Sequence, residues 1–161
     1  MSKQSFQELA EEVTEDEFKD FVGDNAYKFA EARKRALAGK KECWSWLILF
    51  FAPIWSAYYK MWTPVLVIFS ASILTGILAQ SPGAGSVVGQ IIAVIYALRL
   101  KTGYVRYAYQ KISALKEVES DPDRLKAILK KKGGTSKLSA AAVIVFILLL
   151  LLVRVAAETE I

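Results

Sequence analysis

Apolar and polar residues occupy separate long blocks of this chain. Residues 44–98 are almost entirely apolar, and Lys60 is the one charged residue among them. A second apolar block, residues 138–157, has Arg154 as its one charged residue and is about twenty residues long, enough to cross the hydrocarbon core of a bilayer. Uninterrupted apolar blocks of this length are typical of membrane helices. The pattern therefore predicts an all-α integral membrane protein.

The charged blocks that flank the apolar ones are predicted to fold as short helices. Thr14 and Glu17 have the spacing of a capping box, which starts a helix. A second helix, capped by Asp24 or Asn25, is expected to follow. It should end just before Gly39, because glycine readily takes the left-handed conformation of a helix end.

Residues 101–137 carry a second set of polar helices. Val105 and Ile112 lie two helical turns apart and predict a buried face. Asp121, which a proline follows, is typical of a helix start. The glycine pair that begins at Gly133 is typical of a helix end.

Tryptophan and tyrosine gather in the first apolar block, between residues 44 and 62. Their rings favour the headgroup level of a bilayer, where the ring is in apolar surroundings and its polar atom stays hydrated. Pro53 is expected to kink the helix. We interpret this segment as a re-entrant or interfacial helix, anchored to the membrane by Trp44, Trp46, Trp55, Tyr58 and Trp62.

Two further apolar runs, residues 64–80 and 86–100, are joined by a short turn. Residues 21–43 carry a net charge of +3 and residues 99–137 a net charge of +7, so both are expected on the cytoplasmic side of a membrane. An even number of crossings must then lie between them, which favours a hairpin of two spans. The alternative is four full spans, and it leaves the +7 segment outside.

The predicted organisation has about three transmembrane spans and a cytoplasmic N-terminus. An acidic tail and cytoplasmic helices occupy residues 1–43, and the aromatic element and the hairpin occupy residues 44–100. Amphipathic, basic cytoplasmic helices occupy residues 101–137. The C-terminal span occupies residues 138–161.

Small residues form a stripe on the predicted hairpin: Ser72, Gly76, Gly85, Gly89 and Ala93. Small side chains let helix backbones approach closely. We expect the stripe to pack the two hairpin helices against each other. A docking face for another protein is the competing use.

Most catalytic and metal sites need residues that this chain lacks. It has no histidine and one cysteine, Cys43, and its apolar blocks contain no Asp or Glu. This composition excludes histidine-based catalysis and multi-cysteine metal sites, and it disfavours a carboxylate proton relay. We expect no catalytic residue, cofactor or metal. An idle Cys43 is the preferred interpretation, and an acylated or reactive one is the alternative.

Basic residues lie directly beside the apolar blocks. The formal net charge is +5, and this placement indicates anionic lipid rather than nucleic acid as the partner. Contact with lipid or with a protein partner is predicted for Arg99, Lys101, Arg106 and Lys111.

Two motifs resemble a known family. The first is Phe21-Val22-Gly23-x-Asn25-x-Tyr27, and the second is Trp44-x-Trp46 followed by Phe50-Phe51-Ala52-Pro53-Ile54-Trp55-x-x-Tyr58-x-Lys60-Met61. They are similar to the bacterial inner-membrane proteins catalogued as domain of unknown function 2628. The resemblance implies a helical protein of the bacterial cytoplasmic membrane and brings no assigned activity.

These features predict a non-enzymatic integral membrane protein. We expect an accessory or scaffold subunit whose partners are other membrane-protein subunits of a larger inner-membrane complex, or anionic membrane lipids. The alternative is a small oligomeric transporter or channel, in which Ser70, Thr75, Gln80 and Gln90 would have to supply the polar path. A third class, an enzyme acting on lipid, lacks recognisable acid–base residues.

Overall fold

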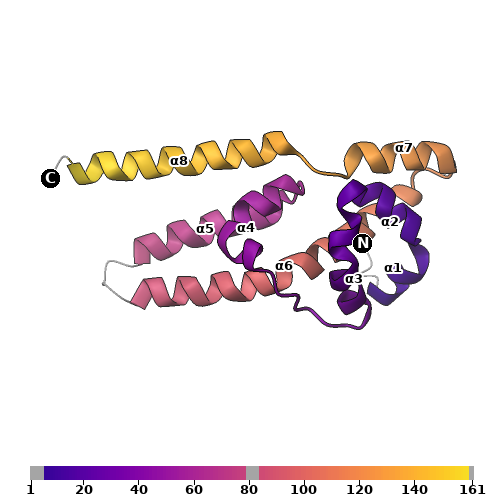
Figure 1. Cartoon of the computed structure of the whole chain (residues 1–161), viewed down its shortest axis with the longest axis horizontal. Helices are drawn as coiled ribbons and strands as arrows, with labels where there is room; N and C mark the ends of the chain where they lie inside the picture. The colour runs from indigo at the N-terminus through magenta and orange to yellow at the C-terminus, as the bar shows by residue number, and fades with distance from the viewer. Residues whose placement is uncertain (1–5, 79–83, 160–161) are drawn as a thin grey trace.

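The chain folds into two parts that lie end to end (Figure 1). The structure is a computed structural model that describes residues 6–78 and 84–159, without the side chains of Leu49, residues 71–93, Arg154 and the residues from 157 onward. Every regular element in these ranges is a helix, so the predicted all-α class is confirmed.

We name the two parts the charged half and the apolar half. The charged half contains α1 (Phe6–Glu12), α2 (Glu15–Val22), the 3₁₀ helix η1 (Gly23–Phe29), α3 (Ala30–Leu37), the second part of α6 (Ala84–Lys116) and α7 (Pro122–Lys132). The apolar half contains α4 (Trp46–Tyr58), α5 (Trp62–Leu78), the first part of α6 and α8 (Lys137–Thr159). The apolar helices extend along the long axis of the molecule, and α1 to α3 gather at its other end (Figure 1).

Several helix ends follow the local sequence signals. Thr14 N–H donates to Glu17 Oε2 at 2.7 Å and Glu17 N–H donates to Thr14 Oγ1 at 3.3 Å, which confirms the capping box. Gly39 follows α3 with a left-handed φ of 73°. At the start of α7, Asp121 Oδ1 accepts from Asp123 N–H at 2.9 Å. Local hydrogen bonding is enough to fix these boundaries.

The helix α3 begins later than predicted, at Ala30 rather than near Asp24 or Asn25. The preceding residues wind as η1. In this arrangement Phe29 is 1% exposed, and its ring centroid lies 4.7 Å from that of Tyr104. Burying an aromatic ring contributes roughly 2 kcal/mol, against about 1 kcal/mol for a side-chain cap, so core packing decides the course of this segment.

The helix α6 connects the two halves. It has 33 residues and is therefore about 50 Å long. It passes the predicted domain boundary at residue 100 without a break. At that boundary the helix stays regular, and its side chains pass from the apolar half into the charged half. Val105 and Ile112 are fully buried in the charged half, as their spacing predicts.

The helix α4 bends in its middle. Phe51, two residues before Pro53, has non-helical angles (φ −120°, ψ 25°), which confirms the predicted kink. Proline causes it because it lacks the N–H that the helix needs and crowds the preceding turn. Cys43, just before α4, bonds to Leu98 of α6, and Lys60, just after α4, bonds to the segment between α7 and α8. Both ends of α4 thus lie at the boundary between the halves.

Among the described residues, one helix is long and apolar enough to cross a membrane. Its most apolar window is 11% buried, and the stretch ends at Val153 inside α8. Large apolar side chains are exposed along α8: Leu138, Ile144, Val145, Phe146, Leu148, Leu149, Leu150, Leu151, Leu152, Val153 and Val155. One candidate span is therefore found, and the hairpin of α5 and α6 stays a prediction.

The helix α8 packs on the other apolar helices through a small cluster. Ala57 of α4, Val65 of α5 and Val143 of α8 are buried together. The rings of Phe69 and Phe146 meet edge to face with 5.3 Å between their centroids. These contacts hold α8 alongside α4 and α5.

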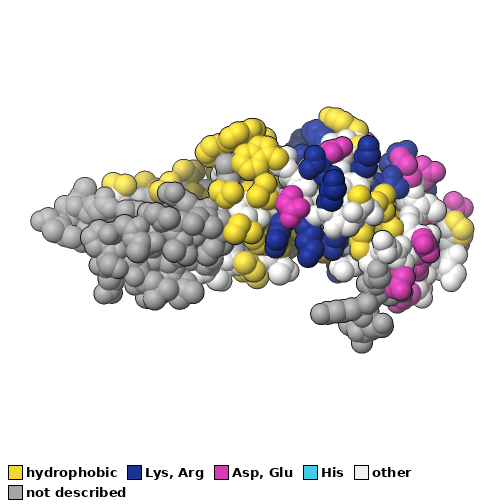
Figure 2. Space-filling model, turned by 90° about the horizontal axis from the view of Figure 1, so that it is seen from below, with side chains coloured by type: hydrophobic (Ala, Val, Ile, Leu, Met, Phe, Trp, Pro, Cys, Tyr) yellow, Lys and Arg dark blue, Asp and Glu magenta, His cyan; other side chains and the backbone are white. Residues whose placement is uncertain are grey.

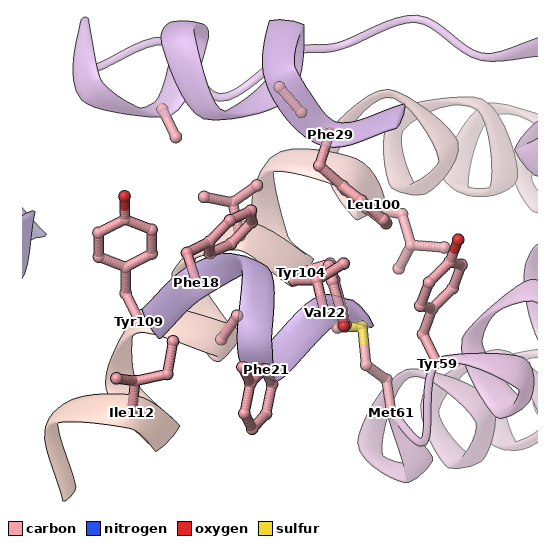
Figure 3. Packing of buried hydrophobic residues seen from close by; sticks show 14 of the residues in the cluster. Phe18, Phe21, Val22, Phe29, Tyr59, Met61, Leu100, Tyr104, Tyr109 and Ile112 are labelled. Atoms are coloured by element: carbon pink, nitrogen blue, oxygen red, sulfur yellow. The ribbon is translucent and has the colours of Figure 1, made fainter. Parts of the chain in front are cut away.

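The charged half packs around α6, in a core that continues to Trp55 and Tyr59 of the α4 region. Phe18 from α2, Phe29 from η1, and Tyr104 and Tyr109 from α6 are all buried (Figure 3). Arg33 Nε donates to Tyr109 Oη at 2.8 Å at the edge of this core. The charged half is thus a folded unit with interlocked side chains.

Three hydrogen bonds fasten the segment between α7 and α8 to the rest of the chain. We call the residues that make them the joint: Phe21, Tyr58, Lys60, Gly133, Gly134 and Ser136. Gly134 N–H donates to Phe21 O at 2.6 Å, and Ser136 N–H donates to Tyr58 O at 2.7 Å. The Lys60 ammonium group donates to Gly133 O at 2.5 Å. The joint therefore ties α2 in the charged half to the end of α4 in the apolar half.

Lys60 has a backbone conformation that glycine usually adopts. Its φ is 58°. Met61 N–H donates to Ser56 O at 2.8 Å and Lys60 N–H donates to Ala57 O at 3.0 Å, which are the two bonds of a Schellman helix end. A left-handed non-glycine residue is strained by roughly 1 kcal/mol, and the charge-assisted bond from the ammonium group offsets this strain.

Gly133→Ala is expected to open the joint. A Cβ atom at this position would lie 1.9 Å from Phe21 O, a backbone atom that cannot rotate away. We expect the free energy of unfolding to fall by about 3 kcal/mol. Gly103→Ala in α6 is the control, because its Cβ meets nothing within 4 Å and alanine favours a helix. Thermal unfolding in detergent checks this, and equal midpoints for the two variants would contradict it.

Candidate functional site

The segment between α3 and α4 crosses α6 at the boundary between the halves. Cys43 N–H donates to Leu98 O at 2.7 Å. The hydroxyl of Thr102 lies within hydrogen-bonding distance of the carbonyl oxygens of Lys41 and Arg99, and Thr102 is 2% exposed. Because Leu98 and Thr102 are one helical turn apart, these contacts fix the line along which the segment crosses α6.

The crossing brings together basic residues that are distant in the sequence. We call four of them the collar: Lys40, Lys41, Arg99 and Lys101. Lys101 is half-buried and the other three are exposed. None of the four takes part in the salt bridges found in the described part of the chain. Figure 2 shows basic side chains gathered next to apolar ones on one face of the molecule.

Exposed aromatic rings follow the collar along the chain. Trp44 and Trp46 pack edge to face with 4.8 Å between their centroids, and they stay 47% and 65% exposed. Leu47 and Phe50 continue the exposed apolar surface along α4, and Trp62 is exposed at the start of α5. Exposed tryptophan between a basic and an apolar surface is typical of a bilayer interface.

Trp55 lies in the core, so the prediction that it anchors the chain at a membrane surface is wrong. Its ring is 8% exposed, with centroid distances of 4.7 Å to Tyr59 and 6.1 Å to Tyr104. Tyr58 is half-buried and packs edge to face on Tyr59 at 5.1 Å. The reason is geometric: this side of α4 faces α6, and the rings fill the space between the two helices.

Tyr104 lies among the rings of Phe29, Trp55 and Tyr59. In the described part of the chain, its hydroxyl is the one buried side-chain polar atom without a hydrogen-bond partner. An unpaired buried hydroxyl costs about 1–3 kcal/mol, which the packing of the ring must outweigh. The aromatic cluster therefore acts as a packed core between the halves.

Arg106 and Lys111 lie away from Arg99, about 10 Å and about 18 Å further along α6. The Arg106 guanidinium sits over the ring of Phe6 at 5.1 Å, and the Lys111 ammonium group sits over the ring of Tyr107 at 5.8 Å. The predicted set of four basic contact residues is thus divided. Arg99 and Lys101 belong to the collar, whereas Arg106 and Lys111 belong to the charged half.

The predicted packing stripe lies outside the described side chains. It consists of Ser72, Gly76, Gly85, Gly89 and Ala93, whose backbones belong to α5 and α6. Its role in packing the hairpin stays a prediction.

A groove of about 890 Å³ lies between α2, η1, α3 and α7. Its charged residues largely pair with each other: Arg33 with Glu15 at 3.0 Å and Lys130 with Asp20 at 3.7 Å. The hydrogen bond from Arg33 lowers the pKa of the Glu15 carboxyl. Among the described residues, no three His, Cys, Asp or Glu side chains are grouped as metal ligands. The groove therefore presents paired charges, in contrast to the unpaired collar.

Comparison with known proteins gives one match. The family model described as "Protein of unknown function (DUF2628)" matches residues 11–112, from the end of α1 to the charged part of α6. The collar and α4 lie inside this match, and α7 and α8 lie outside it. No curated protein and no solved structure matches the chain.

Thr102→Val is expected to loosen the crossing. Valine keeps the shape of threonine but not its hydroxyl, so Lys41 O loses its partner and the free energy of unfolding falls by about 1 kcal/mol. Thr102→Ser retains the hydroxyl and is the matched control. Hydrogen exchange of residues 40–45, followed by mass spectrometry, should be faster in the valine variant alone. Unchanged exchange in that variant would contradict the role given to the hydroxyl.

Proposed function

We propose that this chain, which belongs to the family of proteins of unknown function DUF2628, is a non-enzymatic integral membrane protein. It serves as an accessory or scaffold subunit of a larger complex in the bacterial cytoplasmic (inner) membrane. Its task is to hold a folded helical unit, the charged half, at the cytoplasmic surface of that membrane.

The exposure of the apolar half supports the membrane location. Along α8, large apolar side chains such as Phe146 and Leu149 are about half exposed. Each exposed leucine or phenylalanine would gain roughly 1.5–3 kcal/mol by full transfer out of water. Monomeric soluble proteins rarely expose so large an apolar surface, and a bilayer would cover it without a partner protein.

The topology follows from the positions of the charges. The charged half lies in the cytoplasm with the N-terminus, α5 and α6 form the two-span hairpin, and α8 crosses outward. The helix α4 enters and leaves on the cytoplasmic side, because both Cys43 and Lys60 are bonded at the boundary between the halves. At about 20 Å, α4 is also too short to cross a bilayer.

The observation that carries the scaffold proposal is the joint. A subunit that only tethers a domain needs a flexible linker, whereas here Gly133 and Gly134 are hydrogen-bonded to both halves. The aromatic cluster of Trp55, Tyr59 and Tyr104 adds side-chain packing across the same boundary. A domain held in one orientation can present a defined surface to a neighbouring subunit.

The test is extraction from native membranes. The chain should stay in the membrane after alkaline carbonate treatment and, in mild detergent, should be recovered at a fixed ratio with one larger complex. Lys60→Met removes the bond to Gly133 O and should reduce recovery of the partner severalfold, because the charged half loses its fixed orientation. Lys126→Met on the exposed face of α7 makes the same chemical change away from the joint and should leave recovery unchanged.

Two results would contradict this proposal. Release of the chain by carbonate would exclude an integral membrane protein. Recovery of the chain alone would exclude a subunit, and solute flux in reconstituted vesicles would then favour the small oligomeric transporter or channel.

A further inference from the structure

We propose that the collar binds the phosphate group of an anionic phospholipid, an inference that rests on the membrane role proposed above. The occupant is the lipid of the surrounding bilayer. The argument uses the charge of the collar, its position and the way in which the fold assembles it.

The collar residues form no salt bridge in the described part of the chain, although Lys40, after Arg35, contributes to lowering the pKa of the Glu31 carboxyl. Nearby arginines are neutralised, since Arg33 pairs with Glu15 at 3.0 Å and Arg35 pairs with Glu31 at 2.7 Å. Glu42 is the one carboxylate in the crossing segment, so the collar keeps a net positive charge that an anion can neutralise.

The collar lies where a headgroup would be. Lys40 and Lys41 precede the exposed pair Trp44 and Trp46 by a few residues, and Arg99 lies next to Leu98, at the end of the apolar part of α6. Tryptophan rings favour the headgroup level, and lysine and arginine favour the phosphate layer next to it. The exposed apolar side chains beside the collar favour a lipid, which has acyl chains to cover them, over a soluble anion.

The fold also holds the collar in place before any lipid arrives. Cys43 N–H donates a hydrogen bond to Leu98 O at 2.7 Å. The buried Thr102 hydroxyl lies within hydrogen-bonding distance of the carbonyl oxygens of Lys41 and Arg99. These contacts hold the backbone of residues 40–43 against α6. Less backbone conformational freedom is therefore lost when the basic side chains contact lipid phosphate.

The test is the lipid preference of the full chain in phosphatidylcholine vesicles that contain phosphatidylglycerol. Spin-labelled forms of the two lipids give their relative affinity for the protein surface. We expect phosphatidylglycerol to be preferred severalfold, since each basic side chain contributes about fivefold at an anionic surface. The triple variant Lys40→Gln, Lys41→Gln, Arg99→Gln should bring the ratio close to that of an uncharged surface.

The control triple variant is Lys111→Gln, Arg124→Gln, Lys126→Gln. It removes the same number of charges from the charged half, and α7 begins at the end of that half farthest from α8 (Figure 1). Its preference for phosphatidylglycerol should stay as in the natural chain. High ionic strength should weaken the preference of the natural chain, a readout that needs no substitution.

Several outcomes would overturn the proposal. The first is an equal affinity of the natural chain for both lipids. The second is an equal loss of the preference for phosphatidylglycerol in both triple variants. The third is competition by inorganic phosphate that exceeds the effect of sodium chloride at the same ionic strength. Release of the chain from vesicles by carbonate would contradict the membrane role itself. A chain that stays in the vesicles but shows no lipid preference would contradict only the proposal that the collar binds lipid.

Discussion

The hydrogen bond from the Lys60 ammonium group to Gly133 O sets how the two halves of this protein meet. It joins the end of α4 to the segment between α7 and α8, and Gly134 N–H continues the contact to Phe21 of α2. The approach is so close that position 133 has no room for a Cβ atom. Together with the unbroken helix α6 and the aromatic cluster of Trp55, Tyr59 and Tyr104, this contact sets the orientation of the charged half and the position at which α8 begins.

On the two sides of this contact the chain separates its charged residues from its apolar surface. The continuous helix α6 carries both environments, and the segment before α4 crosses it at Leu98 and Thr102. The crossing places the collar next to exposed tryptophan rings. The proposed membrane anchoring and lipid contact both rest on this one arrangement of basic side chains, exposed tryptophan rings and backbone hydrogen bonds.

Local sequence signals predicted a good part of this fold. The capping box at Thr14, the kink at Pro53 and the buried face of α6 each depend on residues within a few positions of each other. Contacts across long sequence distances could not be predicted this way. No local signal shows that Lys41 meets Thr102 or that Gly133 meets Phe21. The burial of Trp55 could not be predicted either, because it depends on Tyr104 of α6, which lies more than forty residues further along the chain.

The central claim is that the two halves keep one relative orientation in the membrane. Spin labels at Val118 in the charged half and Leu66 in α5, both exposed positions, would report it in vesicles when Cys43 is replaced by serine. Double electron–electron resonance should give a single narrow distribution of distances between the labels. A broad distribution would mean that the charged half moves freely on its connection, and it would contradict the account.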